Sequence, residues 1–255
     1  MTGAVLITGA GSRVGAALAR GLAKDDWAVA IHYSRSETGA LALQNEINTS
    51  GGTAEAVSAN LNIPADYNSL IARASKALGQ PLTALINNAS TFTADTAENF
   101  TPATFDHHMN VNLRAPLALS QHFAAQVPSH KQGAIINMLD QRVLKPNPMF
   151  FTYSISKSAL YWSTKTLAQS LAPKVRVNAI GPGPTLKNAA QTEDHFSHET
   201  KSTLLGYGSP PDRILDAARY LLSAKSVTGQ MIAVDGGQHL TWQTEDLVAG
   251  YPSGE

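Results

Sequence analysis

Seven short apolar runs, separated by stretches with a helical pattern, constrain the fold of this chain more than any other feature of its sequence. The runs are rich in valine and isoleucine and mostly lack alternating polar residues, which is typical of strands buried on both faces of a parallel sheet. Helical stretches at 14–25, 69–79 and 156–172 lie between such runs. This alternation predicts right-handed βαβ units and a Rossmann-type, doubly wound α/β domain with a seven-stranded parallel sheet. The expected strands are 4–8, 28–33, 54–58, 82–87, 134–139, 175–180 and 231–235.

One domain over residues 1–255 is the simplest organisation, because no linker, repeat or low-complexity tract interrupts the pattern. Two segments are irregular. The first is a polar loop at about 181–210, rich in turn formers, which we expect to carry short helices and to shape the substrate site. The second is a C-terminal tail at about 241–255, which we expect to pack on the surface or on a neighbouring subunit.

Charge and cysteine content exclude several functions. Lysine and arginine together number 19, as do aspartate and glutamate, so the chain has no electrostatic footprint for nucleic acid or an anionic membrane. No apolar run reaches the roughly 18 residues of a membrane span, and the apolar N-terminus lacks the basic residues of a signal peptide. Without cysteine, thiolate catalysis is excluded, and His195 with His198 alone does not predict a metal site. We therefore expect a cytoplasmic protein with no nucleic-acid partner, no membrane partner and no metal.

The glycine-rich motif TGAGSRVG follows the first expected strand and begins a helix, which is the context that a dinucleotide-binding loop requires. Gly9 permits a tight turn, Gly11 lets the backbone approach phosphates, and Gly15 lets the helix pack close to the sheet. Backbone N–H groups at the helix start, including those of Arg13 and Val14, would face a pyrophosphate. Since such turns also serve purely structural ends, this motif alone does not decide the function.

The end of the second expected strand reads IHYSRSE and bears on the choice of cofactor. An NAD site usually places an acidic residue there to hold the ribose hydroxyls. Here His32, Arg35 and Ser36 supply hydrogen-bond donors, and the first acidic residue follows them. With Arg13 in the same region, these donors suit a 2′-phosphate through charge-assisted hydrogen bonds. A solvated turn with an incidental arginine is the alternative, and the pattern favours NADPH.

Tyr153 and Lys157 lie four residues apart in YSISK, at the start of the helix that follows the fifth expected strand. This spacing places both side chains on one helical face. A nearby ammonium and a positive nicotinamide lower the pKa of a phenol, so Tyr153 can serve as a general acid near neutral pH. The position at the carboxyl end of a parallel sheet, where ligands bind, distinguishes this pair from a chance surface pair.

These motifs, in this order, resemble the short-chain dehydrogenase/reductase family over residues 4 to about 240. NNAS after the fourth strand, Asn112, and the PG and DGG turns near the last strands complete the match. The resemblance implies a single Rossmann-type domain, a homotetramer or homodimer, and hydride transfer involving a nicotinamide cofactor. It also implies that Tyr153 is the acid/base and that Lys157 positions the ribose and lowers the tyrosine pKa. Asn112 would help to hold a proton-relay water.

The same resemblance assigns the contacts with NADPH. The family usually has Asp-Leu or Asp-Val after the third strand, where the aspartate meets the adenine; Asn60 stands here, and its amide oxygen can still accept that bond. Thr185 is the candidate for the nicotinamide carboxamide. The implied cofactor residues are Gly9, Gly11, Arg13, Val14, Gly15, His32, Tyr33, Arg35, Ser36, Asn60, Leu61, Asn88, Ala89, Ser90, Lys157, Pro182, Gly183 and Thr185.

Three departures from the family pattern narrow the substrate. Arg13 replaces a glycine, Ser90 replaces the glycine of Asn-Asn-Ala-Gly, and Asp140 replaces the serine thirteen residues before the tyrosine. Together with the HYSRS strand end, these changes are similar to the pteridine reductases and the bacterial dihydromonapterin reductases. That similarity implies that a pterin ring lies between Phe92 and the nicotinamide, with Asp140 paired to the tyrosine. The implied substrate contacts are Arg13, Ser90, Phe92, Asp140 and Tyr153.

The residues agree with this chemistry on their own. An aspartate beside Tyr153 can pass a proton and accept hydrogen bonds from a ring amine or amide, whereas a serine suits a ketone oxygen. Phe92 would offer a platform to a flat heterocycle, although its spacing alone favours a core aromatic. We expect an NADPH-dependent reductase of a dihydropterin such as dihydromonapterin, dihydrobiopterin or dihydrofolate. Hydride would reach a ring carbon of a C=N bond, and Tyr153, assisted by Asp140 and Lys157, would relay the proton.

Two other functions stay open. The first is an NADPH-dependent reductase of another carbonyl substrate, such as a ketoacyl thioester, a sugar or a quinone. The second is a non-catalytic NADP-sensing protein, against which the intact set of Tyr153, Lys157 and Asn112 argues.

Overall fold

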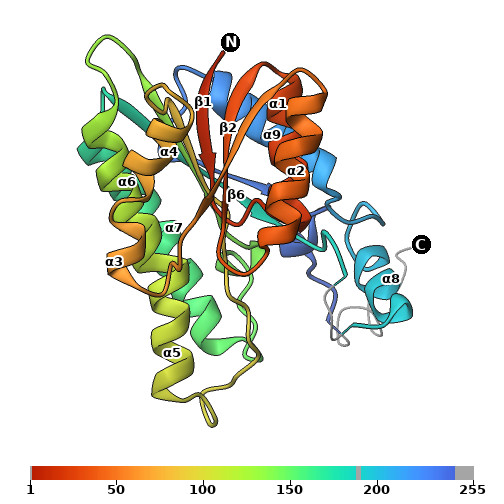
Figure 1. Ribbon diagram of the computed structural model, residues 1–255. Helices are drawn as coiled ribbons and strands as arrows, with labels where there is room; N and C mark the ends of the chain where they lie inside the picture. The colour runs from red at the N-terminus through yellow and green to blue at the C-terminus, as the bar shows by residue number, and fades with distance from the viewer. Residues whose placement is uncertain (1, 188–190, 245–255) are drawn as a thin grey trace.

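A seven-stranded parallel sheet forms the centre of the computed structural model, which describes residues 2–187 and 191–244 (Figure 1). The strand order is β3-β2-β1-β4-β5-β6-β7, and every neighbouring pair is parallel. The predicted Rossmann-type fold is therefore confirmed, and each strand overlaps the range expected from the sequence. The strands are β1 Gly3–Ile7, β2 Trp27–Tyr33, β3 Thr53–Ser58, β4 Ala84–Asn87, β5 Gly133–Met138, β6 Val175–Pro182 and β7 Met231–Val234.

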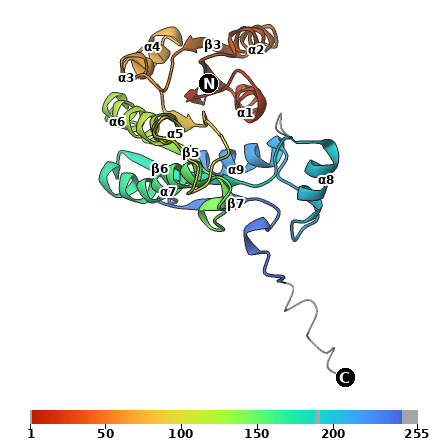
Figure 2. The same ribbon diagram turned by 90° about the horizontal axis from the view of Figure 1, so that it is seen from below.

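Helices cover both faces of the sheet, as the view along it shows (Figure 2). One apolar layer packs α1, α2 and α9 against the strands, and the other packs α4, α6 and α7. Because both faces are covered, β1, β4 and β5 are buried along their whole length, which explains their continuous apolar sequence. The helices are α1 Arg13–Lys24, α2 Glu37–Thr49, α3 Pro64–Tyr67, α4 Leu70–Ala77, α5 Pro102–Met109, α6 Ala115–Gln126, α7 Phe151–Leu171, α8 Glu193–Lys201 and α9 Pro211–Ser223.

The strand order reverses direction between β1 and β4, which creates the switch point where α/β sheets bind ligands. The segments after β1, β4, β5 and β6 all leave the sheet at its carboxyl edge, the lower edge in Figure 1. The helix α7 begins at this edge, as predicted for the helix that carries Tyr153. The fold therefore brings together segments that are far apart in the sequence.

The predicted polar loop at about 181–210 contains α8 beside the carboxyl edge, which agrees with the expectation of short helices (Figure 1). Residues 188–190 of that loop and 245–255 of the predicted tail lie outside the described residues. Within the described ranges, no helix has the length and apolar character needed to cross a bilayer.

Candidate active site

A cleft of about 1410 Å³ opens at the carboxyl edge of the sheet. Its walls come from the ends of β1, β4, β5 and β6 and from α8. Many residues predicted from the sequence line it: Arg13, Val14, Asn88, Ser90, Phe92, Asp140, Tyr153, Lys157, Pro182, Gly183 and Thr185.

The glycine loop has the shape expected of a dinucleotide-binding turn. Gly9 adopts a φ of +65°, and a Cβ atom at Gly11 would lie 2.5 Å from Ser36 Oγ, so a side chain there would clash. A Cβ at Gly15 would lie 2.4 Å from the carbonyl oxygen of Gly9, which confirms the close helix packing. Ser12, at the start of α1, makes no side-chain cap. The N–H groups of the first helical turn therefore suit the pyrophosphate of a dinucleotide.

Arg13 differs from the expectation in two respects. Its φ is +52°, a left-handed conformation that a side chain disfavours by about 1 kcal/mol or more. A glycine, which the family usually has at this position, would adopt this φ without that strain. Its guanidinium donates to the carbonyl oxygens of Leu186 at 2.9 Å and Lys187 at 3.0 Å. Arg13 thus connects the start of α1 to the segment that follows β6, across the cleft.

His32 is a structural residue and not a phosphate donor, which corrects the prediction. Its side chain is only 1% exposed. Nδ1 accepts from the backbone N–H of Gly9 at 3.0 Å, so the ring proton lies on Nε2, which donates to the carbonyl of Ala59 at 3.1 Å. Both ring nitrogens are engaged, and burial lowers the pKa of His32 to about 4. The histidine therefore ties the glycine loop to the end of β3.

This burial predicts a pH dependence of stability. The folded protein keeps His32 neutral down to about pH 4, whereas the unfolded chain protonates it near its ordinary pKa of about 6.5. The unfolded state then binds more protons, so the free energy of unfolding should fall as the pH decreases from about 6.5 to 4, by up to about 3 kcal/mol. Urea unfolding across this range should show a steeper decline for the wild type than for His32→Gln. Parallel curves would contradict the assignment.

Four other residues near the ends of β2 and β3 were predicted to contact the cofactor, and their surroundings differ. Arg35 is exposed and Ser36 is half-buried beside the glycine loop, while Tyr33 Oη donates to Glu37 Oε1 at 3.1 Å. Asn60 accepts from the N–H of the residue two positions ahead, in its own turn. None of these four lines the cleft described above. Any contact they make with a cofactor belongs to a shallower part of the surface.

Leu61 is 4% exposed, and its side chain packs in the core. Only its backbone can reach a cofactor, so the prediction cannot hold for the side chain.

Thr8 is a residue that the sequence analysis missed. It is buried, and its hydroxyl oxygen accepts from the backbone N–H groups of Asn88 and Ala89, both at 2.9 Å. Asn88 Nδ2 returns a hydrogen bond to the carbonyl of Thr8 at 2.8 Å. These bonds fasten the ends of β1 and β4 at the switch point. Its position at the end of the first expected strand, where the glycine-rich motif begins, is a signal that could have identified it.

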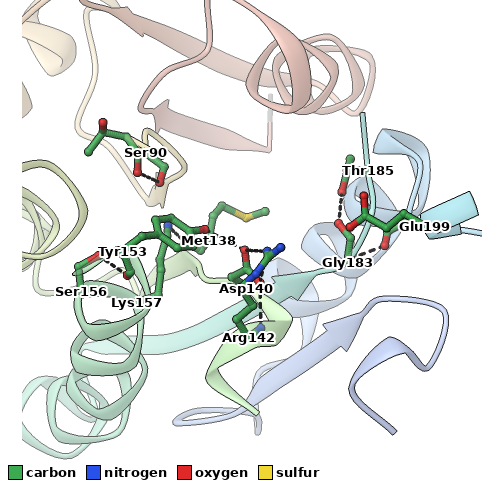
Figure 3. Close-up of polar contacts among 12 residues, drawn as sticks. Ser90, Met138, Asp140, Arg142, Tyr153, Ser156, Lys157, Gly183, Thr185 and Glu199 are labelled. Carbon is green, nitrogen blue, oxygen red and sulfur yellow. Dashed lines mark hydrogen bonds and ion pairs between the residues drawn. The ribbon is translucent and has the colours of Figure 1, made fainter. Parts of the chain in front are cut away.

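Tyr153, Asp140 and Arg142 form a hydrogen-bonded group on one wall of the cleft (Figure 3). Tyr153 Oη donates to Asp140 Oδ2 at 2.9 Å, the pairing that the resemblance implied. Arg142 Nη1 lies 3.0 Å from the same carboxylate oxygen, and the backbone N–H of Arg142 donates to Asp140 Oδ1 at 2.8 Å. Arg142 was not predicted from the sequence, although its place two residues after Asp140 offered a signal.

The environment of the Tyr153 hydroxyl differs from the prediction. Burial and then the charge and hydrogen bond of Asp140 raise the pKa of Tyr153 well above its usual value, against the lowering effect of Arg142. Lys157 does not supply the expected lowering: Nζ donates to the carbonyl of Met138 at 2.8 Å and lies 5.7 Å from the centre of the tyrosine ring. Burial lowers the pKa of Lys157 to about 8. One helical face carries both residues, but the lysine reaches back to β5.

Asn112 lies in a π-helical turn, Asn110–Arg114, between α5 and α6, and is fully buried. Its amide nitrogen donates to the carbonyl of Thr91 at 3.0 Å and to Ser156 Oγ at 3.1 Å. Its amide oxygen accepts from the N–H of Thr91 at 2.8 Å and from Ser90 Oγ at 3.2 Å. The four hydrogen-bonding positions of the amide are thus taken by protein. The side chain holds the segment after β4 in place. Its amide has no free donor or acceptor left to bind the predicted water.

Phe92 is not a core aromatic, because 41% of it is exposed and it lines the cleft. Its ring stacks on Phe150 with centres 4.4 Å apart and meets the Tyr153 ring edge-on at 4.8 Å. The guanidinium of Arg142 lies over the Phe150 ring at 4.9 Å. An apolar platform therefore lies beside the Tyr153 ring.

The turn after β6 forms a separate group on the right of Figure 3. Thr185 Oγ1 donates to the carbonyl of Gly183 at 3.0 Å. A Cβ atom at Gly183 would lie 2.7 Å from Asp235 Cα, so this glycine allows the turn to cross the end of β7 closely. Among the described residues, no group of three or more histidine, aspartate or glutamate side chains could hold a metal ion.

Known proteins resemble this chain over most of its length. The family model described as short chain dehydrogenase matches residues 3–197. The dihydromonapterin reductase of Klebsiella pneumoniae is 30% identical over 92% of this chain and 96% of its own length. The 3-oxoacyl-(acyl-carrier-protein) reductase of Staphylococcus aureus is 29% identical over 94% and 99%. The FolM alternative dihydrofolate reductase 1 of Brucella canis, solved in complex with NADP, has a TM-score of 0.93 and 41% identity over 96% of both chains.

Proposed function

Because this chain belongs to the short chain dehydrogenase family, we propose that it is an NADPH-dependent oxidoreductase that reduces a pteridine. The observation that carries the proposal is the pairing of the Tyr153 hydroxyl with the Asp140 carboxylate beside the exposed Phe92 ring. A carboxylate and an aromatic platform suit a flat heterocycle that has N–H groups at its rim. Two relatives whose names refer to pterin or folate reduction support this choice of substrate.

The glycine loop, the residues that follow β2 and the residues of the cleft together fit a nicotinamide dinucleotide. The glycine loop and the first turn of α1 would hold the pyrophosphate, and Arg35 with Ser36 at the end of β2 would hold the 2′-phosphate. Lys157 lines the same cleft and would hold the ribose. NADPH supplies the hydride when it is bound.

The proton for the ring nitrogen comes from the Tyr153 hydroxyl in this proposal. Burial and Asp140 keep the hydroxyl protonated at neutral pH, and Asp140 holds its direction through the 2.9 Å hydrogen bond. When the hydroxyl turns to the substrate, the carboxylate can accept a hydrogen bond from the heterocycle instead. Arg142 compensates the negative charge of the aspartate throughout.

A direct assay tests the proposal. Purified protein mixed with NADPH and dihydromonapterin, dihydrobiopterin or dihydrofolate should consume NADPH, as followed by its absorbance. The alternative is a reductase of a carbonyl substrate, and the similarity to the 3-oxoacyl reductase supports this alternative. Brisk reduction of ketones without turnover of any pterin would establish that alternative. NADPH binding without turnover of either class would favour the non-catalytic, NADP-sensing function.

We also propose that the chain assembles as a homotetramer or a homodimer. Trp162 on α7 is 67% exposed, which is unusual for a large aromatic side chain and is typical of an interface. Light scattering of the purified protein would determine the assembly. The cytoplasmic location stays a prediction.

Arg13→Gly should weaken the binding of both NADPH and the pterin by about tenfold, because the charged donor that joins α1 to the segment after β6 is lost. The melting temperature should not fall, since glycine accepts the φ of +52° without strain. Fluorescence titration with NADPH and the KM for the pterin measure the two effects. Arg13→Lys retains the charge and the strain and serves as the comparison. Unchanged binding in Arg13→Gly would show that the arginine contributes to neither the NADPH site nor the pterin site.

A further inference from the structure

Three buried polar side chains form a hydrogen-bonded chain behind Tyr153. His108 of α5, Thr152 of α7 and Asp95 of the segment between β4 and α5 are 1%, 0% and 6% exposed. His108 Nδ1 lies 2.7 Å from Thr152 Oγ1, and the threonine hydroxyl also contacts Asp95 Oδ2. Polar side chains are retained in a protein core only when they are hydrogen-bonded. The role of these three hydrogen-bonded side chains therefore needs an explanation.

The direction of each hydrogen bond follows from the contacts. The backbone N–H of Thr93 points at His108 Nε2 at 3.2 Å, so this nitrogen must be the acceptor. The neutral imidazole then carries its proton on Nδ1 and donates it to Thr152 Oγ1. The threonine hydroxyl in turn donates to the Asp95 carboxylate. A single arrangement therefore satisfies the backbone of residue 93, the histidine, the threonine and the aspartate.

Asp95 also holds the beginning of α7. Its Oδ1 accepts from the backbone N–H of Thr152 at 3.0 Å, and its carbonyl accepts from the N–H of Phe151 at 3.1 Å. The residue at the cap position, Phe150, makes no side-chain cap. The Asp95 carboxylate therefore caps the positive N-terminal end of α7, because the residue at the cap position does not.

The anchored backbone positions adjoin the two rings of the active site. Thr93 follows Phe92 directly, and Thr152 precedes Tyr153. Phe92 lies outside any helix or strand, so its place depends on its neighbours. Asn112 binds the backbone on one side of it, at Thr91, and His108 binds the backbone on the other side. The distance of 4.8 Å between the Phe92 and Tyr153 rings therefore rests on these two anchors.

We propose that His108, acting through Thr152 and Asp95, is a positioning residue that sets the Phe92 ring against Tyr153 and so fixes the slot for the substrate ring. The identity of that ring rests on the proposed function, whereas the hydrogen-bond chain does not. None of the three side chains touches the cleft. Their influence on the reaction is therefore exerted through the backbone on both sides of the slot.

The position of the Phe92 ring relative to Tyr153 should become less fixed at acidic pH. A protonated imidazole carries N–H groups on both nitrogens, so the N–H of Thr93 would lose its acceptor. Burial lowers the pKa of His108; Asp95 acts against this lowering, and His107 and Lys157 act with it. Because this pKa is lowered, the KM for the pterin should begin to rise only at a pH lower than about 6.5, the ordinary pKa of histidine. The KM for NADPH should follow this change much less, because the cofactor does not depend on Phe92.

Thr152→Val and Thr152→Ser form the matched pair that tests the proposal. Valine keeps the shape of threonine and removes the hydroxyl, whereas serine keeps the hydroxyl. In the whole protein, Thr152→Val should raise the KM for the pterin about tenfold. Thr152→Ser should restore most of that loss. The dissociation constant for NADPH should change less than about twofold in both variants. A KM unchanged in Thr152→Val, or an equal loss of NADPH binding, would overturn the proposal.

A spectroscopic measurement on the wild type covers the case in which Thr152→Val does not fold. Long-range proton–nitrogen NMR spectra report the tautomer of each of the eight histidines, and loss of a signal in His108→Gln assigns this one. We expect a neutral ring with the proton on Nδ1 that titrates below the usual range. A proton on Nε2 would overturn the proposal. If the wild type reduces no pterin, the proposed function fails, and the NMR spectra still decide the hydrogen-bond chain.

Discussion

Replacing Tyr153 by phenylalanine should lower kcat for the pterin by about 10³-fold, the effect expected when a positioned proton donor is removed. Tyr153 is only 5% exposed and its ring packs against the rings of Phe92 and His108, contacts that phenylalanine keeps. What it loses is the hydroxyl that Asp140 binds. The affinity for NADPH should stay within about twofold of the wild type. Steady-state kinetics and a fluorescence titration measure the two quantities separately.

The same substitution at Tyr161 provides a matched control. Tyr161 lies on the same helix but contacts Lys165 and lines a different cavity. Tyr161→Phe should leave kcat unchanged, so any general effect of altering α7 would appear in both variants. A Tyr153→Phe enzyme with activity near that of the wild type would remove the tyrosine from the mechanism.

Asp140→Asn should lower kcat by about 10²-fold and should shift the alkaline limb of the pH profile toward neutrality. Burial is the first cause that raises the pKa of Tyr153, and the charge and hydrogen bond of Asp140 are the next. Removing the charge lowers this pKa, while Arg142 keeps its positive charge nearby. Because the donor must be protonated, activity is lost as the pH rises through the pKa of the tyrosine. The wild type should therefore retain its rate to a higher pH than the variant.

The measurement is kcat for the pterin from neutral pH to about pH 11 for both proteins. Asp212→Asn, at the exposed start of α9, changes the same charge at a residue that does not line the cleft and should leave the profile as it is. The double variant Tyr153→Phe/Asp140→Asn should show no alkaline limb from the tyrosine. An alkaline limb that stays in place, or moves to higher pH, in Asp140→Asn would contradict the proposed pairing.

The fold could be predicted almost completely from the sequence. Strands buried on both faces leave a continuous apolar signature, and the alternation with helices restricts the topology to parallel crossovers. The glycine loop and the pair of Tyr153 and Lys157 could also be predicted from the sequence, because a turn conformation and a helical spacing are local properties. The family resemblance added Asp140 and Phe92, and the structure places both in the cleft.

His32, Asn112 and Lys157 differ from their predicted roles because each contacts residues far from it in the chain. His32 was expected at a phosphate, but its ring is buried between the glycine loop and the end of β3. Asn112 was expected at a water, yet four protein groups saturate its amide. Lys157 was expected to act on the tyrosine, but it binds a carbonyl of β5. In each case the residue type was compatible with several partners, and only packing selected one.

Apolar periodicity, glycine conformation and the order of motifs along the chain were enough to predict the sheet, the nucleotide turn and the chemical groups available at the carboxyl edge. Which of these groups contact one another became clear only from the packing of the folded chain. It placed Arg142 on Asp140, bound Arg13 to the segment after β6, and linked His108 to Asp95 through Thr152. These contacts join separate elements of the fold. A hydrogen bond between distant segments leaves no periodic signal in either of them, so no reading of one segment reveals it.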